Sequence, residues 1–265
     1  MKNFIVIFII SALTSHAWAE QKQVKSRSQV VQKKQKSELR EEEESKISVR
    51  PSFDFVTISP SELNNYYSNL SQKLGIVDQY KISGGTGFSI SGDYSFTENF
   101  SLGLRLDYFS ASSNTVQLKN GAARANFQSS LSALPLYLTA TYKYPIPAAP
   151  KFSVGAVVGA GIPLSYHLNT EITGSNIEVL PNGTATYSAT PLSGFGSIFG
   201  SYDLAKTIST RLEFGYRFVS SDNMKLNDNY GFNDKAGDLL KDDSGSKVNV
   251  SASSFFVGAG VSATF

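Results

Sequence analysis

Apolar and polar residues alternate through most of the chain from Ser48 onward, and this period of two is typical of strands with one covered face. The end of the chain keeps the period without a break. Counting back from Phe265, every second residue is apolar, whereas the residues between are small or polar apart from Phe256. Seven earlier segments repeat the pattern. We therefore predict an all-β fold with eight strands, over residues 49–55, 82–96, 100–108, 134–144, 152–164, 192–204, 208–218 and 255–265.

One of these segments departs from the pattern. Between residues 192 and 204, glycines occupy the face expected to be apolar, and Phe195 and Phe199 lie on the other face. An extra residue in a β-bulge would exchange the two faces. The sequence leaves open whether this strand contains a bulge or has its faces reversed.

The connections between the predicted strands alternate strictly in length. Short turns at one end and long loops at the other are typical of an up-and-down membrane barrel, whose apolar face points outward to lipid. A soluble barrel of the lipocalin kind would bury the apolar face, and it has no need of this alternation. We expect an antiparallel transmembrane barrel. The short connections are 97–99, 145–150 and 205–207; the long ones are 59–80, 111–127, 167–189 and 220–247.

The polar face of the predicted strands carries five basic and four acidic side chains. Eight strands enclose a lumen just wide enough for side chains to fill. Isolated buried charge is costly, so these groups must pair with one another or meet water. Gly258 and Gly260 fall on the same inward face of the last strand and leave room for them. The predicted interior charge network comprises Arg50, Asp54, Asp93, Arg105, Asp107, Lys143, Arg211, Glu213 and Arg217.

Aromatic residues gather where the predicted strands meet the short turns. Amphipathic rings favour the boundary between membrane and water. We expect one girdle at the short-turn end, made of Tyr94, Phe96, Phe100, Tyr142, Tyr144, Phe152, Tyr202 and Phe265. Tyr108, Tyr166, Tyr216, Phe218 and Phe255 are expected to form the opposite belt.

The N-terminal part of the chain has a different character. Residues 1–19 combine Lys2, an apolar run and an Ala-Trp-Ala site, which predicts a secretory signal peptide cleaved after Ala19. Residues 20–47 are charged and contain no aromatic residue, so we expect a flexible tail rather than a folded unit. Either the tail is a solvated linker, or its basic part meets an anionic partner. The barrel is assigned to residues 48–265.

Composition excludes several kinds of chemistry. The chain has no cysteine, which rules out thiol chemistry and cysteine-bound metal centres, and its net charge of +2 argues against a nucleic-acid-binding protein. We expect no cofactor, no metal site and no catalytic site. His167 and Ser165 are the one pair that would suit a lipid-modifying enzyme, and they lack a His-x-Ser arrangement.

Two of the long connections carry further signals. In the first, Ser59 as N-cap, Pro60, Glu62 three residues on and Gly75 as the stop predict a short helix. This helix would either cap the barrel mouth or present a surface to a partner. Its predicted apolar stripe comprises Leu63, Tyr66, Tyr67, Leu70 and Leu74. The last connection is rich in aspartate without the spacing of a calcium loop, which favours a solvated loop.

The signal peptide, the eight alternating strands and the aromatic C-terminal residue together resemble the small outer-membrane barrels of the OmpA, OmpX and OmpW type. The resemblance implies that the barrel-assembly machinery reads the last strand. It also implies a periplasmic tail and C-terminus, extracellular long loops, and contact with outer-membrane lipids and lipopolysaccharide. The assembly signal maps onto Phe255, Val257, Ala259, Val261, Ala263 and Phe265.

Three functions are compatible with this resemblance. The first is a structural or surface-interaction role, through envelope integrity, lipopolysaccharide or an extracellular partner. The second is a narrow OmpW-like channel for small or apolar molecules, suggested by aromatic side chains on the nominal inner face. The third is a lipid A-modifying enzyme. The inner-face aromatics are Phe109, Phe195, Phe199 and Phe256.

Overall fold

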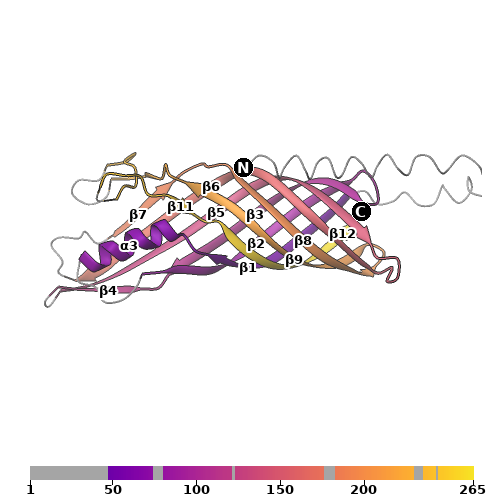
Figure 1. Ribbon diagram of the computed structural model, residues 1–265, viewed down its shortest axis with the longest axis horizontal. Coiled ribbons are helices and arrows are strands. Elements are labelled where there is room, and N and C mark those ends of the chain that lie inside the picture. The colour runs from indigo at the N-terminus through magenta and orange to yellow at the C-terminus, as the bar shows by residue number, and fades with distance from the viewer. Residues whose placement is uncertain (1–46, 74–79, 121–122, 176–182, 230–234, 243) are drawn as a thin grey trace, which may run out of the picture. The chain divides into compact units, whose positions relative to one another are not determined.

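A computed structural model describes residues 47–73, 80–120, 123–175, 183–229, 235–242 and 244–265. Among the strands in this part of the chain, eight form a closed antiparallel ring in which each strand pairs with the next and the last pairs with the first (Figure 1). The predicted eight-stranded barrel is therefore confirmed. Its strands are β1 (Ile47–Ile58), β2 (Ile82–Ser95), β3 (Phe100–Ser113), β5 (Ala123–Pro145), β6 (Phe152–Ser175), β8 (Ser193–Ala205), β9 (Ile208–Ser221) and β12 (Ser254–Thr264).

Strand β12 closes the ring between β9 and β1. Phe53 lies opposite Ala259 and Val56 opposite Phe256, and the ladder continues past the strand end. The backbone N–H of Phe265 donates to the carbonyl of Ile47 at 2.8 Å. A sheet closed in this way has no open edge, so the last strand is paired along its whole length. This pairing explains why the alternation of apolar and polar residues continues to Phe265.

The two ends of the barrel differ as the connection lengths predict. Three tight turns, at 96–99, 146–151 and 206–207, lie together at one end (Figure 1). We call this the short-turn end. The opposite loop end carries the helix α3 (Ser61–Lys73) and the small strands β4 (Val116–Asn120), β7 (Gly183–Ser188), β10 (Lys225–Leu226) and β11 (Val250–Ser251).

The expectation of loops over 111–127 and 167–189 was largely wrong, because β5 and β6 continue far beyond the other strands. β5 has 23 residues and β6 has 24, and their outer halves pair with each other, with β4 and with β7. In these extensions the outward residues are polar, as Gln128 and Ser130 illustrate. The segment therefore lacks the apolar outer face by which the other strands were recognised.

A bulge in β6 also overturns the expected position of Tyr166 in the outward belt. Leu134 pairs with Ser165 but Pro135 pairs with Pro163, so Leu164 is an extra residue. Beyond this point the two faces of β6 exchange. Tyr166 is fully buried in the lumen, where its hydroxyl donates to the carbonyl of Val250 at 2.7 Å. In β8, by contrast, the register shift lies only at the strand end, between Asp203 and Ala205.

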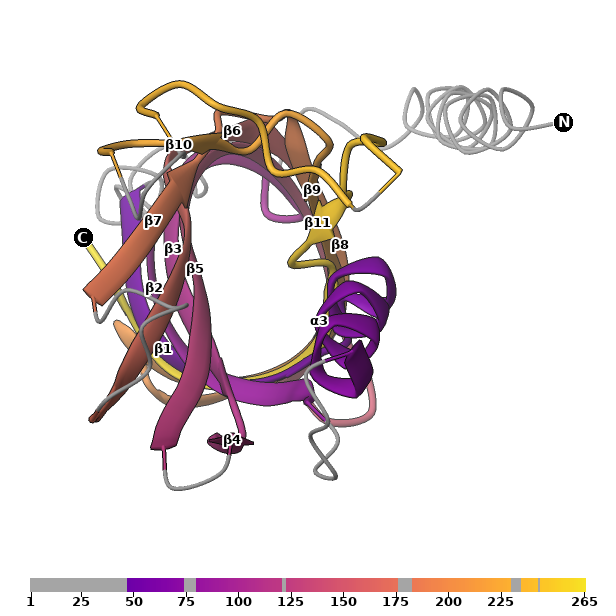
Figure 2. The same ribbon diagram turned by 90° about the vertical axis from the view of Figure 1, so that its left-hand side faces the viewer.

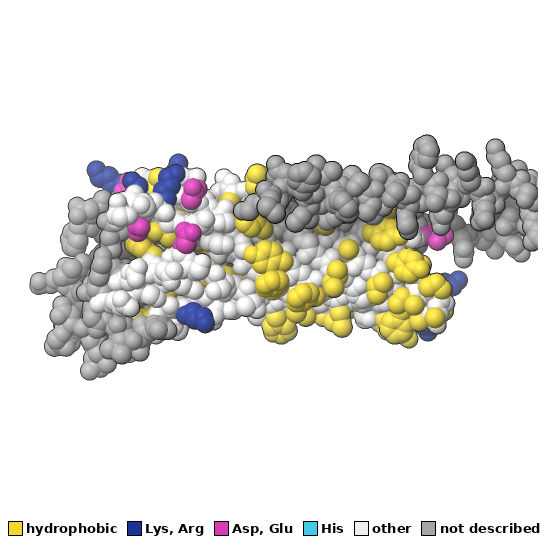
Figure 3. All heavy atoms as spheres, in the orientation of Figure 1, with side chains coloured by type: hydrophobic (Ala, Val, Ile, Leu, Met, Phe, Trp, Pro, Cys, Tyr) yellow, Lys and Arg dark blue, Asp and Glu magenta, His cyan; other side chains and the backbone are white. Residues whose placement is uncertain are grey.

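The outer surface toward the short-turn end is strongly apolar. Phe55, Leu138 and Leu212 each have about two-thirds of their side-chain surface exposed, at 66%, 65% and 66%. Hydrophobic side chains gather over this part of the barrel in Figure 3, whereas the loop end is polar and charged. An apolar surface this large marks a membrane or protein contact. No helix among the described residues combines the length and apolar character needed to cross a bilayer.

The approach of β5 to β6 depends on Gly161, which pairs with Tyr137. A Cβ atom on Gly161 would clash with the backbone carbonyl group of Leu136, whereas a Cβ on Gly200 would meet open space. We predict that Gly161→Ala lowers the free energy of unfolding by about 1–3 kcal/mol, the usual cost of overpacking. Gly200→Ala is expected to change it by less than about 1 kcal/mol. Urea titrations of the refolded barrel in detergent measure both; equal effects would contradict the close packing at Gly161.

Candidate functional site

The middle of the lumen is occupied by two arginines that share three carboxylates. Arg105 on β3 donates from Nε to Asp107 Oδ1 at 2.5 Å and from Nη1 to Glu213 Oε1 at 2.7 Å. Arg217 on β9 donates from Nε to Asp107 Oδ2 at 2.8 Å and from Nη2 to Asp54. Both arginines are almost wholly buried. Each of these side chains therefore has a charged partner, which buried charge requires.

Strand geometry brings these residues together. Side chains two residues apart on a strand point to the same face, so Arg105 and Asp107 both enter the lumen from β3, as do Glu213 and Arg217 from β9. Asp54 enters from β1 and lies opposite Gly258 of β12. A Cβ on Gly258 would overlap the carboxylate of Asp54, so this glycine provides the space that the network needs.

Four buried phenylalanines complete the filling of the lumen. The guanidinium carbon of Arg217 lies 3.9 Å from the ring centre of Phe256, and that of Arg211 lies 3.5 Å from Phe199. Contacts of this kind are favourable between a cation and the face of a ring. Phe195 packs on Arg105 and Phe109 on Arg217. The aromatics that suggested a channel are thus packed against the ion pairs.

A second group of charges lies nearer the short-turn end. Arg50 is 3.7 Å from Asp93, and Arg211 Nη2 is 3.1 Å from Glu213 Oε2. Lys143 is half-buried and makes no ion pair with any residue that the structure describes. The structure thus joins eight of the nine predicted interior charges in ion pairs and leaves Lys143 apart. The paired set, four arginines and four carboxylates, is electrically neutral.

Toward the loop end the interior becomes apolar. Helix α3 lies at one side of this opening (Figure 2), and its inward side chains pack over the apolar interior. Leu63 and Tyr67 are buried beneath the helix. The ring of Tyr67 packs against Tyr80 and Phe127 at 4.6 and 5.0 Å, and its hydroxyl lies 2.7 Å from Thr170 Oγ1. Burial raises the pKa of Tyr80 to about 12, and it also raises that of Tyr67, so both phenols are neutral at physiological pH.

The first loop differs in detail from its prediction. The helix begins at Ser61, and the first of its backbone bonds runs from Asn64 N–H to the carbonyl of Pro60, so Pro60 occupies the cap position assigned to Ser59. Glu62 accepts from the backbone N–H of Asn249, in the last loop. Leu63 and Tyr67 of the apolar stripe face inward, as a cap requires. Leu70 has no described side chain, and Leu74 and Gly75 lie outside the described residues.

Part of the last loop packs inward, although most of its described residues are exposed, as expected of a solvated loop. Met224, Leu240 and Val248 are each at least 95% buried. Val248 N–H donates to the carbonyl of Leu240, and Leu240 N–H to that of Met224. The aspartates therefore lie around a small apolar core that joins the loop to α3 and the barrel interior.

The predicted girdle and assembly residues lie on the outside of the barrel. All eight girdle aromatics lie at the short-turn ends of their strands or in the adjoining turns, and the rings of Phe152 and Tyr202 pack 4.7 Å apart. Within the assembly segment, Phe255, Val257 and Val261 are about half exposed and Phe265 is 72% exposed, while Ala259 and Ala263 share their face.

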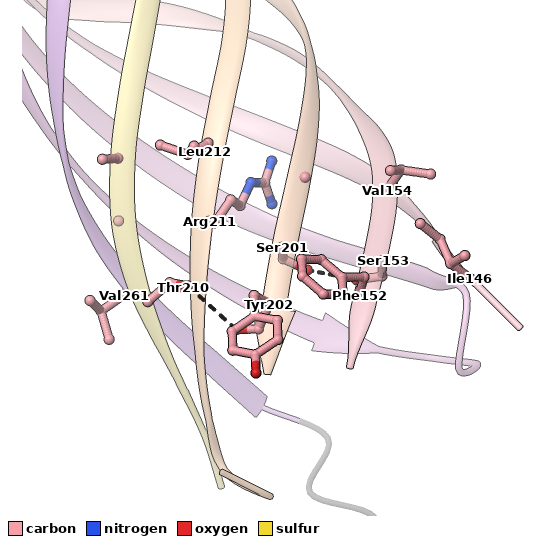
Figure 4. Close-up of a pocket in the computed structure, with 13 residues that line it drawn as sticks. Ile146, Phe152, Ser153, Val154, Ser201, Tyr202, Thr210, Arg211, Leu212 and Val261 are labelled. Atoms are coloured by element: carbon pink, nitrogen blue, oxygen red, sulfur yellow. Dashed lines mark hydrogen bonds between the residues drawn. The ribbon is translucent and has the colours of Figure 1, made fainter. Parts of the chain in front are cut away.

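A shallow groove follows the outer wall at the short-turn end (Figure 4). Its volume is about 590 Å³, and Phe152, Val154, Tyr202, Leu212 and Val261 line it. The groove forms where the exposed Gly200 leaves the surface without a side chain. It belongs to the apolar belt, with few polar groups to orient a ligand.

The described residues offer little for catalysis or metal binding. They contain no cluster of three or more potential metal ligands. His167 and Ser165 lie on the same face of β6 beyond the bulge, yet no hydrogen bond joins them. A nucleophile and its base need such a bond.

A closed ring with an apolar exterior and a neutral, ion-paired lumen defines a transmembrane β-barrel. Residues 37–262 match the family model of the outer membrane protein β-barrel domain. The chain therefore belongs to this family, whose members reside in the bacterial outer membrane. No curated protein matches the chain.

Several solved structures are similar to this chain, at low identity and with TM-scores below 0.5. Neisserial surface protein A is 15% identical, covering 83% of this chain and 97% of its own at a TM-score of 0.42. OprG from Pseudomonas aeruginosa is 12% identical (83% and 96%, TM-score 0.46). The protease OmpT from Escherichia coli is 10% identical (83% and 95%, TM-score 0.38). At these identities and TM-scores the likeness carries no argument about function.

Removing Arg217 would leave Asp54 and Asp107 with too little positive charge. We predict that Arg217→Met lowers the free energy of unfolding by about 3–5 kcal/mol, the usual cost of breaking a buried ion pair from one side. Lys143→Met is the matched control and is expected to cost less than about 1 kcal/mol, because Lys143 has no ion-pair partner among the residues that the structure describes. Urea unfolding in phospholipid bilayers compares the two, and a similar loss in both variants would contradict the network.

The cap depends on Tyr67 more than on exposed positions of the same helix. We predict that Tyr67→Ala raises the hydrogen-exchange rate of the α3 amides about tenfold or more, since exchange follows local opening. Asn69→Ala, at an exposed position two residues away, is the control and is expected to leave exchange unchanged. The barrel strands are expected to stay protected in both variants. Unchanged exchange of α3 in Tyr67→Ala would show that the helix is held by other contacts.

Proposed function

We propose that this protein is a closed, non-conducting outer-membrane barrel with a structural or surface-interaction role. The observation that carries the proposal is the filled lumen: Arg105 and Arg217 bridge β1, β3 and β9 at mid-height, and phenylalanine rings pack against their guanidinium groups. A route for solutes would require this neutral network to separate. Breaking buried ion pairs one at a time costs several kcal/mol each.

In this proposal the short-turn end faces the periplasm and the loop end faces outside. The lengths of the connections support this orientation, because outer-membrane barrels have short periplasmic turns and longer extracellular loops. Residues 1–19 act as a cleaved signal peptide and residues 20–46 as a periplasmic tail, since Ile47, which the sequence assigned to the tail, is the first residue of β1. The assembly machinery reads the segment from Phe255 to Phe265.

The surface role rests on the construction of the loop end. Helix α3 and the last loop are packed together by apolar side chains, and their exposed positions are polar. The extended β5 and β6 strands form a wall beside them. A preorganised polar surface of this kind suits contact with lipopolysaccharide or an extracellular partner.

The narrow-channel and lipid-modifying alternatives are less well supported. Phe109, Phe195, Phe199 and Phe256, which motivated the channel, are at least 93% buried and contact arginines. The enzyme would need a base at His167, whose Nδ1 atom makes no hydrogen bond.

Planar-bilayer recordings test the proposal directly. We predict that the purified wild-type protein gives no conductance steps, since its lumen is filled. Arg217→Ala combined with Phe256→Ala removes a bridging cation and the ring that contacts it, and is expected to produce small, flickering steps. A general porin reconstituted in the same way serves as the positive control. Steady conductance of the wild-type protein would overturn the closed-barrel proposal.

A further inference from the structure

The lumen opens into a small cavity at the short-turn end, which we call the vestibule. Its volume is about 190 Å³, and it is lined by residues from every ring strand except β6, together with the turn at 97–99. A water molecule occupies about 30 Å³ in the liquid, so the vestibule has room for a small polyatomic ion. The ion-paired network above it separates this space from the loop end.

The charges lining the vestibule are unequal. Arg50, Lys143 and Arg211 contribute three positive charges, against Asp93 and Glu98. The one carboxylate partner of Arg211 within ion-pair distance, Glu213, also binds Arg105 and accepts from Ser197 at 2.6 Å.

The hydrogen-bond donors of the vestibule are incompletely used. The Arg211 side chain is only 5% exposed, yet its Nε and Nη2 atoms make no hydrogen bond, although Nη2 lies near Glu213. The buried hydroxyl of Thr141 is also without a partner. A buried donor without an acceptor is unfavourable, and a bound anion would supply the missing acceptor. One buried acceptor of the vestibule, Asp93 Oδ1, likewise makes no hydrogen bond.

Arg211 is held in a fixed orientation by its surroundings. Its guanidinium carbon lies 3.5 Å from the ring centre of Phe199, which itself lines the vestibule. A planar guanidinium fixed against a ring presents its N–H groups in one direction, which suits a tetrahedral or planar oxyanion. Lys143 adds a positive charge from β5.

From these observations we infer that the vestibule binds a phosphate-like oxyanion that enters from the short-turn end. Lys143, Arg211 and Arg50 supply the charge, and the lining serine and threonine hydroxyls supply additional donors. Two sources carry this chemistry: free inorganic phosphate and the phosphate of a lipid headgroup. The vestibule lies outside the filled middle of the lumen, so the inference does not depend on whether the barrel is closed.

Calorimetric titration of inorganic phosphate into the purified protein in phosphate-free, non-ionic detergent tests the site. Wild-type protein is expected to bind saturably with one site. Lys143→Gln and Arg211→Gln are each expected to weaken binding about fivefold or more, equivalent to the loss of one charged contact. Lys206→Gln, an exposed position in the turn between β8 and β9, is the control and is expected to bind as the wild type does.

Folding and the source of the anion are controlled separately. Lys143 makes no ion pair with a described residue, so Lys143→Gln is expected to keep the heat-dependent shift of the folded barrel on SDS gels. Native mass spectrometry of protein extracted from membranes then distinguishes the sources. A phospholipid retained by the wild type and the Lys206 variant, but lost from the Lys143 variant, identifies the headgroup; phosphate binding without a retained lipid identifies the free ion. The inference is overturned if phosphate fails to saturate and no lipid is retained, or if all variants bind equally.

Discussion

The complete pairing of the backbone in a closed ring is the constraint on which the rest of this structure depends. Within a bilayer no water is available for unpaired N–H and C=O groups, so the sheet cannot keep an open edge. The pairing of β12 with β1 satisfies this constraint, and Phe265 extends it to the last residue. Closure with eight strands then fixes a narrow interior, which only side chains fill.

The narrow interior explains why this barrel is stabilised from within by charge. The apolar residues are needed on the outer face, so the inward positions are polar, and burial obliges them to neutralise one another. Arg105, Arg217 and their carboxylates do so across β1, β3 and β9, which ties distant strands together. Phenylalanine rings fill the remaining space without adding charge. The network therefore serves as the core of the barrel.

Much of this architecture could be predicted from the sequence, because membrane barrels impose a two-residue period. The period located all eight strands and placed the charged side chains on the inner face. It could not reveal that Leu164 is an extra residue, which reverses the faces of β6 and buries Tyr166. It also missed the outer halves of β5 and β6, whose outward residues are polar. The pairing of each arginine with a particular carboxylate depends on the stagger of the strands and on the side-chain rotamers. Neither can be read from a single sequence.

The bond between Glu62 and the backbone of Asn249 has a consequence for the order of folding. These residues are 187 positions apart, and they join the first loop to the last. Contacts between distant residues form slowly, because a long segment must first be brought to one place. Helix α3 is the second element along the chain. It therefore gains its hydrogen bond to Asn249 only after the last loop has packed beside it. A completed cap thus marks a barrel in which the first and the last loops have met.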